Sequence, residues 1–141
     1  MTLPQAMVDT SVLVAYLNPD DVHHGDARRE CLRVTDTSAV SISVITYTEL
    51  MVGLLRGGHD PERFEAMLAD LALTLYPVTQ GIAFNAARLR AANRSLRLAD
   101  SLIIATADVM GTGELLTADR AWPRITEKAR LIQEPAGSPP A

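Results

Sequence analysis

The chain has 141 residues and a formal net charge of −4, and 48% of its residues are hydrophobic. This length suits one domain with a full core, and the negative charge excludes a surface that attracts nucleic acid over its whole area. No apolar run is long enough to cross a bilayer and no signal-peptide pattern opens the chain, so neither a membrane partner nor secretion is expected. The single Cys31 cannot form an internal disulfide, so we expect a cytoplasmic protein in which Cys31 packs in the core.

The pattern of residues 6–17 predicts a short buried strand that stops at Asp9, then a turn and an apolar helix. Thr10 or Ser11 is placed to cap this helix, because a hydroxyl can satisfy its free N–H groups. Asp9 would stand at the carboxyl end of a strand, where open α/β sheets bind their ligands. Capping of the helix is the alternative role for Asp9, and it is weakened by three more acids in similar apolar settings.

A charged helix is expected next, over residues 21–34, after a loop that Pro19 interrupts. His23 and His24 lie near its start. No HxxxH spacing exists there, so a solvated helix start is favoured over a metal site.

Residues 38–43 alternate in polarity and predict a second strand. Ser43 is placed to cap the helix that follows over residues 44–55, and a Gly-Gly pair ends it. Glu49 is the only charged residue within that helix. It is therefore the second acid embedded in apolar sequence.

Three further elements are predicted over residues 60–94. Asp60 caps a helix on which Asp70 falls outside the apolar stripe, and a third strand follows over residues 73–79. The last of the three is a helix over residues 80–94. Its packed side is predicted to carry Ala83, Phe84, Ala87 and Ala91.

The stretch 98–107 is apolar nearly all round, which is typical of a helix buried in the core, and Asp100 lies in its first turn. A fourth strand is predicted over residues 114–119. It ends, like the first, on an acid, Asp119. Residues 129–133 predict a last strand at the edge of the sheet.

Strands and helices alternate along the whole chain. Such alternation predicts an α/β fold with a central, mostly parallel sheet of four or five strands and helices on both faces. We expect one domain over residues 1–134. The Pro/Gly/Ser-rich residues 135–141 are expected to form a disordered tail.

The acids that share an apolar setting are Asp9, Glu49, Asp100 and Asp119. In a doubly wound sheet all four can converge at the carboxyl edge, where they would repel one another if unpaired. Carboxylate oxygens suit Mg²⁺ or Mn²⁺, whereas Zn²⁺ prefers Cys and His. The pattern therefore indicates metal-assisted chemistry on a phosphodiester or phosphoester.

The sequence resembles the PIN-domain ribonucleases, and specifically the VapC-type toxins of bacterial toxin–antitoxin pairs. The resemblance covers nearly the whole chain, to about Gln133. It rests on four fragments in order: V-D-T-S at 8–11, T-E-L at 48–50, L-A-D-S-L-I-I-A-T-A at 98–107 and L-T-A-D at 116–119.

The resemblance implies a three-layer PIN-like fold and a Mg²⁺- or Mn²⁺-dependent endoribonuclease that hydrolyses RNA with metal-activated water. The catalytic and metal-binding residues that it implies are Asp9, Glu49, Asp100 and Asp119, the last at a position that the family fills less uniformly. Ser11 and Thr117 match hydroxyl residues that position a carboxylate or water. A homodimer and a cognate antitoxin protein are implied as partners, beside the RNA substrate.

Arg90, Arg94 and Arg97 follow i, i+4, i+7 spacing and predict one basic helix face just before the Asp100 helix. A solvated face is the alternative for any one of them, but as a group they are the candidate RNA-binding track. Asp108 lies near a helix C-terminus, where negative charge is disfavoured, and it matches no family site. We interpret Asp108 as structural.

Two other functional classes remain open. A phosphatase of the haloacid-dehalogenase-like class also begins with an acid at a strand end, but it needs D-x-D, and Ser11 occupies the second position. A non-catalytic PIN-like scaffold would only bind partners, and loss of site acids would mark it. Nucleotide binding is disfavoured because no Gly-rich phosphate loop appears.

Overall fold

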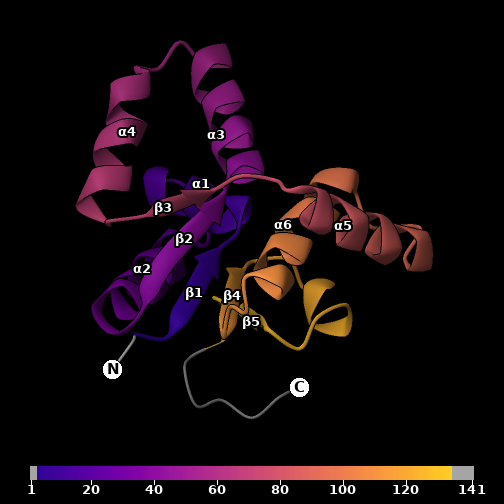
Figure 1. Cartoon of the computed structure of the whole chain (residues 1–141). Helices are drawn as coiled ribbons and strands as arrows, with labels where there is room; N and C mark the ends of the chain where they lie inside the picture. Colours follow the sequence, from indigo (N-terminus) through magenta and orange to yellow (C-terminus); the bar gives the residue numbers. More distant parts are fainter. Residues whose placement is uncertain (1–2, 135–141) are drawn as a thin grey trace.

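A single five-stranded sheet forms the centre of the computed structural model, which describes residues 3–134 (Figure 1). The strand order is β3-β2-β1-β4-β5, and every neighbouring pair is parallel. The strands are β1 Gln5–Val8, β2 Ala39–Ser43, β3 Thr74–Tyr76, β4 Glu114–Thr117 and β5 Ala129–Leu131. The predicted α/β class and parallel sheet are confirmed. The predicted tail over residues 135–141 lies outside the described part of the chain.

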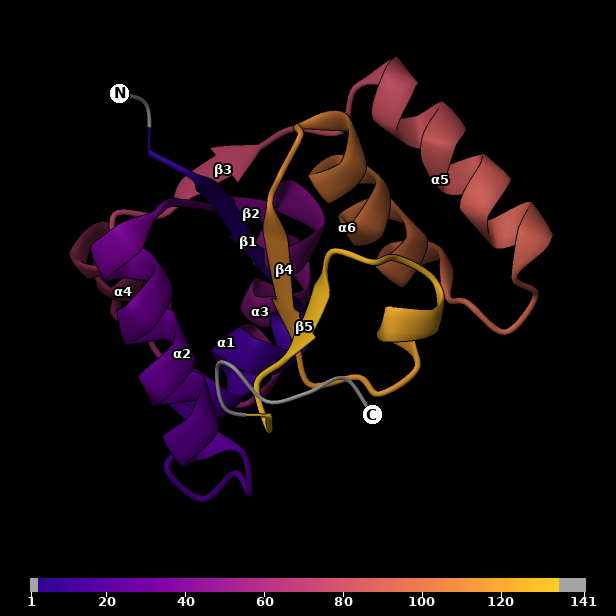
Figure 2. The ribbon, with the colours of Figure 1, turned by 90° about the horizontal axis from the view of Figure 1, so that it is seen from below.

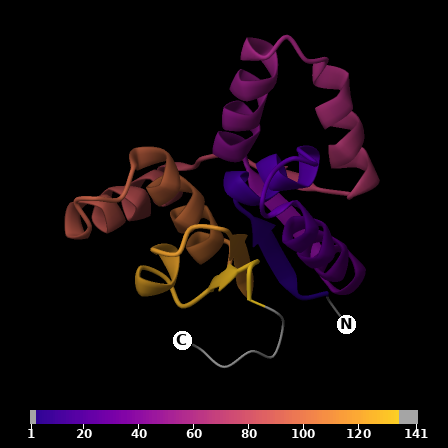
Figure 3. The same cartoon turned by 180° about the vertical axis from the view of Figure 1, so that it is seen from behind.

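Helices cover both faces of the sheet, as predicted. They are α1 Thr10–Leu17, α2 His24–Thr37, α3 Val44–Arg56, α4 Pro61–Asp70, α5 Gln80–Ala92 and α6 Leu98–Val109. The sheet lies between α1 and α2 on one side and α5 and α6 on the other (Figure 2). The α3–α4 pair stands out from the sheet (Figure 1, Figure 3). None of the helices in residues 3–134 is long and apolar enough to cross a membrane.

The alternation of side chains along β1 explains the three layers. Ala6 and Val8 belong to the core that packs under α1 and α2, whereas Met7 belongs to the core on the α6 side. All three are at most 1% exposed. A strand buried on both faces needs a continuous apolar run, and this is the pattern that identified β1 in the sequence.

The interpretations of Cys31 and Asp108 agree with the structure. Cys31 is 1% exposed, and burial raises the pKa of its thiol to about 12, so it packs as an inert apolar side chain. Asp108 lies 3.8 Å from the ammonium of Lys128. This ion pair joins the end of α6 to the loop before β5, which is a structural role.

The predicted packed side of α5 is wrong. The buried residues of α5 are Ile82 and Ala86, and Phe84 is 64% exposed. The four residues that were expected to pack, Ala83, Phe84, Ala87 and Ala91, are all exposed. The helix is so rich in alanine that its apolar residues do not mark one side, and the narrow stripe facing α6 could not be identified from the pattern.

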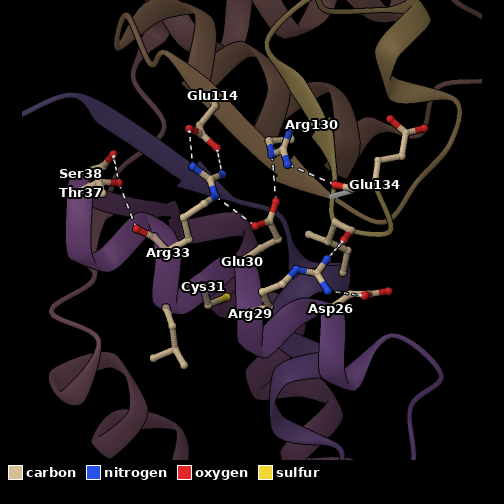
Figure 4. A network of polar contacts seen from close by, with 12 residues as sticks. Asp26, Arg29, Glu30, Cys31, Arg33, Thr37, Ser38, Glu114, Arg130 and Glu134 are labelled. Carbon is tan, nitrogen blue, oxygen red and sulfur yellow. Dashed lines mark hydrogen bonds and ion pairs between the residues drawn. The ribbon is translucent and has the colours of Figure 1, made fainter. Parts of the chain in front are cut away.

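A buried carboxylate on α2 takes part in a network of ion pairs that reaches β4 and β5 (Figure 4). Glu30 is 1% exposed and accepts hydrogen bonds from Arg33 Nε at 3.0 Å and Arg130 Nε at 2.9 Å. Arg33 also pairs with Glu114 at the start of β4, and Arg130 lies on β5. These charges of α2 therefore anchor the predicted charged helix to the sheet, a contact that the sequence alone did not predict.

Candidate active site

The acids meet where the strand order reverses. The chain proceeds from β1 to β2 on one side and from β4 to β5 on the other, so the carboxyl ends of β1 and β4 form the switch point of the sheet. A hollow of about 310 Å³ opens there. Its lining includes all four acids singled out in the sequence: Asp9, Glu49, Asp100 and Asp119.

Asp9 is the most buried of these acids, at 4% exposed. It occupies the N-cap position of α1, yet its side chain makes no capping hydrogen bond, so the alternative role as a helix cap is excluded. Instead, Asp9 Oδ2 accepts hydrogen bonds from Ser11 Oγ at 2.8 Å and Thr117 Oγ1 at 2.9 Å. Burial raises the pKa of Asp9 to about 7, although these two hydrogen bonds lower it. A nearby cation would favour the ionised form.

The expectation that Thr10 or Ser11 caps α1 is wrong, because both hydroxyls serve the carboxylates. Thr10 Oγ1 donates to Glu49 Oε1 at 2.6 Å, and thereby joins the start of α1 to the middle of α3. Glu49 is half-buried. Thr10 is thus a site residue that the sequence reasoning missed. The signal was present, since Thr10 belongs to the V-D-T-S fragment.

Asp100 is held by an arginine from its own helix turn. Asp100 is 7% exposed. Arg97 donates to both of its oxygens, from Nε to Oδ2 at 3.2 Å and from Nη2 to Oδ1 at 3.1 Å. The hydrogen bond to Asp100 raises the pKa of the Arg97 guanidinium, and the charges of Glu49 and Asp9 raise it further. Arg97 therefore lies in the field of three carboxylates.

The prediction that Arg90, Arg94 and Arg97 share one helix face is wrong. Helix α5 ends at Ala92, and Arg97 stands at the N-cap of α6. Asn93 ends α5 by returning its side-chain amide to Leu89 O at 2.9 Å. The chain then turns, so the regular i, i+4, i+7 spacing does not correspond to one surface. All three arginines are exposed, and their contact with RNA stays a prediction.

Asp119 lies in a fixed loop. It is exposed, its Oδ1 accepts from Ala121 N at 2.9 Å, and its own N–H donates to Thr117 Oγ1 at 3.0 Å. Gln133 Nε2 donates to Ala118 O at 2.9 Å from the segment after β5. These contacts hold the Asp119 backbone beside Asp9, with the carboxylate open to the hollow.

The side chains that line the hollow are of the kind that binds a divalent cation. Carboxylate oxygens are the ligands that Mg²⁺ and Mn²⁺ prefer, and the four acids face one space. Within residues 3–134, however, no three acidic, histidine or cysteine side chains are grouped tightly enough to hold a metal as they stand. Asp21 and His23 also line the hollow, although the sequence favoured a solvated helix start for His23.

The family assignment follows from a sequence comparison. The PIN domain model matches residues 6–128. The chain belongs to the PIN-domain family. The three-layer PIN-like fold that the sequence fragments implied is thereby confirmed.

Solved structures of toxin–antitoxin systems are similar to this PIN domain in fold. A toxin–antitoxin complex from Klebsiella pneumoniae is 24% identical, with a TM-score of 0.73 over 90% of this chain and 97% of that chain. VapBC2 from Rickettsia felis, bound to a fragment of promoter DNA, is 18% identical, with a TM-score of 0.74 over 90% and 98%. A sarcin-ricin loop cleaving VapC toxin from Mycobacterium tuberculosis is 23% identical, with a TM-score of 0.64 over 78% and 86%. No curated protein sequence matches the chain.

Proposed function

We propose that this PIN-domain protein is a Mg²⁺- or Mn²⁺-dependent endoribonuclease, the toxin of a type II toxin–antitoxin pair. The observation that carries the proposal is the meeting of four carboxylates from separate elements in one hollow at the switch point of the sheet. The fold similarity to a toxin that cleaves the sarcin-ricin loop supports RNA as the substrate class.

In this proposal Asp9, Glu49 and Asp100 hold the cation, and Asp119 completes the site from its loop. When bound, the cation supplies Lewis-acid stabilisation of the charge that develops on the phosphate, and it lowers the pKa of a water nucleophile. This mechanism needs no attack by the 2′-hydroxyl of the RNA, so the products carry a 5′-phosphate.

The other residues of the site orient the carboxylates. Ser11 on α1 and Thr117 on β4 both donate to Oδ2 of Asp9, at 2.8 and 2.9 Å, and so fix its carboxylate. Thr10 does the same for Glu49. Because these three hydroxyls come from the ends of strands and helices, the two acids lose little rotamer freedom when they act.

A second hollow supports an antitoxin as partner. It has a volume of about 520 Å³, lies between α1, α3 and α4, and shares Val14 and Glu49 with the acid-lined hollow. Leu50, Leu54 and Phe64 give it an apolar lining. We propose that an antitoxin segment lies in this hollow and reaches the acids. A homodimer of the toxin is part of the same proposal, since family resemblance implies it.

The experiment is a cleavage assay with purified protein, a mixed RNA pool and Mg²⁺ or Mn²⁺. Asp9→Asn is the matched control, because the amide oxygen can still accept from Ser11 and Thr117 while the charge is lost. We expect cleavage by the natural protein and none by Asp9→Asn. A folded natural protein that leaves RNA intact with either metal would favour the non-catalytic scaffold.

A further inference from the structure

Arg97 places a positive charge where the proposed function requires a metal ion. Both of its hydrogen bonds go to Asp100, one to each carboxylate oxygen, at 3.2 and 3.1 Å. A planar guanidinium matches a carboxylate in this two-point geometry. Both oxygens of Asp100 are therefore engaged by a side chain of the same protein.

The surroundings of Arg97 extend this relationship to the whole site. Arg97 lines the acid-lined hollow together with the four acids. The charges of Glu49 and Asp9, as well as that of Asp100, act on its guanidinium. It therefore relieves part of the repulsion that a group of carboxylates would otherwise suffer.

The two partners differ greatly in their freedom to move. The side chain of Asp100 is 10% exposed, whereas that of Arg97 is 73% exposed. Because most of its side chain is exposed, Arg97 can leave Asp100 by rotating into solvent without opening the core. An ion pair with one such exposed partner is weak, which makes its exchange for a stronger cation feasible.

We propose that Arg97 is an internal competitor of the divalent cation. This inference rests on the proposed function, because it concerns how the same site takes up its metal. Arg97 neutralises Asp100 until the cation binds, and the cation must displace it to reach the carboxylate. Arg97 thus acts through Asp100 as a positioning residue that sets the metal affinity.

The test measures Mn²⁺ binding without RNA, by calorimetric titration of EDTA-treated and dialysed protein. Arg97→Gln removes the competing charge, and Arg97→Lys keeps the charge but not the two-point geometry. Arg88→Gln, on the exposed side of α5, is a control with the same change in net charge. We expect Arg97→Gln to bind Mn²⁺ on the order of fivefold to tenfold more tightly than the natural protein. Arg97→Lys should fall between them, and Arg88→Gln should not differ.

A second measurement, thermal unfolding with and without Mn²⁺, tests whether Arg97→Gln loses stability. Without metal, Arg97→Gln should unfold at a lower temperature because Asp100 has lost its partner, and saturating Mn²⁺ should raise its midpoint by more than it raises that of the natural protein. Equal or weaker Mn²⁺ binding by Arg97→Gln, with cleavage of RNA by the natural protein, would overturn the role of Arg97 alone. Absence of Mn²⁺ binding and cleavage in the natural protein would overturn the proposed function with it.

Discussion

Thr117 donates its hydroxyl to Asp9 Oδ2 across 2.9 Å, and the two residues lie 108 positions apart in the chain. The bond joins the carboxyl ends of β4 and β1, whose backbones also meet where Asp9 N donates to Leu116 O at 2.9 Å. A buried carboxylate is thus fixed at the switch point of the sheet. The burial of Asp9 and its hydrogen bonds to Ser11 and Thr117 lead to predictions that can be measured.

The first prediction concerns pH and Asp9→Asn. Burial raises the pKa of Asp9 from 3.8 to about 7, so the folded protein holds a proton that the unfolded chain releases between these values. This contribution of Asp9 to stability is therefore greatest below pH 4 and is lost as the pH rises to about 7. In EDTA, Asp9→Asn should gain stability relative to the natural protein between pH 4 and pH 8, by up to about 4 kcal/mol.

Urea unfolding of both proteins at the two pH values checks this prediction. The difference between the two proteins cancels the titration of all other groups that the substitution leaves unchanged. An equal stability difference at pH 4 and pH 8 would mean that Asp9 has an ordinary pKa.

The second prediction concerns the hydroxyl of Thr117. Thr117→Val keeps the shape of the side chain but removes a hydrogen bond that lowers the pKa of Asp9. The pH at which RNA cleavage reaches half its maximum should rise, and activity at pH 7 should fall on the order of tenfold. Thr117→Ser retains the donor and should resemble the natural protein. A pH profile that is the same for Val and Ser would assign Thr117 to packing only.

The third prediction concerns the buried charge of Glu30. Glu30→Gln leaves Arg33 and Arg130 without their shared carboxylate, and these arginines are 30% and 26% exposed. Since water can reach them, the loss of unfolding free energy should be moderate, about 2–3 kcal/mol. Asp26→Asn, which breaks the more exposed pair with Arg29, should cost under about 1 kcal/mol. Equal losses in denaturant unfolding would contradict the anchoring role of Glu30.

The fourth prediction concerns RNA binding by Arg90 and Arg94. Both are exposed and precede the Asp100 helix in the sequence. Arg97, in contrast, is hydrogen-bonded to Asp100. The logarithm of RNA affinity falls linearly with the logarithm of salt concentration. Joint replacement of both arginines by Gln should make this slope shallower by about 1.4, because two fewer counterions are released from single-stranded RNA. The measurement uses an Asp9→Asn background to prevent turnover. Joint replacement of Arg28 and Arg56 is the control of equal charge, and an unchanged slope in both would place all four arginines outside the RNA track.

Local patterns allowed much of the fold to be predicted from the sequence. Ser43 caps α3 by accepting from Ile45 N at 3.0 Å, and Asp60 caps α4 by accepting from Glu62 N at 2.9 Å, both as expected. The buried strand before Asp9 was identified from its continuous apolar run. These features depend on residues a few positions apart, so composition and spacing are enough to find them.

The features that the sequence did not predict depend on tertiary contacts. Glu30 pairs with Arg130 across 100 positions, and no local pattern distinguishes that pair from solvated charges. The Arg97–Asp100 pair is local, but its significance depends on Glu49 and Asp9 arriving from other elements. The arginine spacing was misinterpreted because a local pattern suggested one helix where the chain has a turn after Ala92.

The central claim is that RNA is hydrolysed by metal-dependent chemistry at Asp9, and the chemistry of the cleaved ends tests it most directly. The natural protein and Asp9→Asn are incubated with one labelled RNA in Mg²⁺ and in excess EDTA, and the product ends are identified by mass spectrometry. We predict 5′-phosphate and 3′-hydroxyl ends for the natural protein in Mg²⁺, and intact RNA in the other three reactions. Cleavage that persists in EDTA, or products that end in a 2′,3′-cyclic phosphate, would contradict the claim.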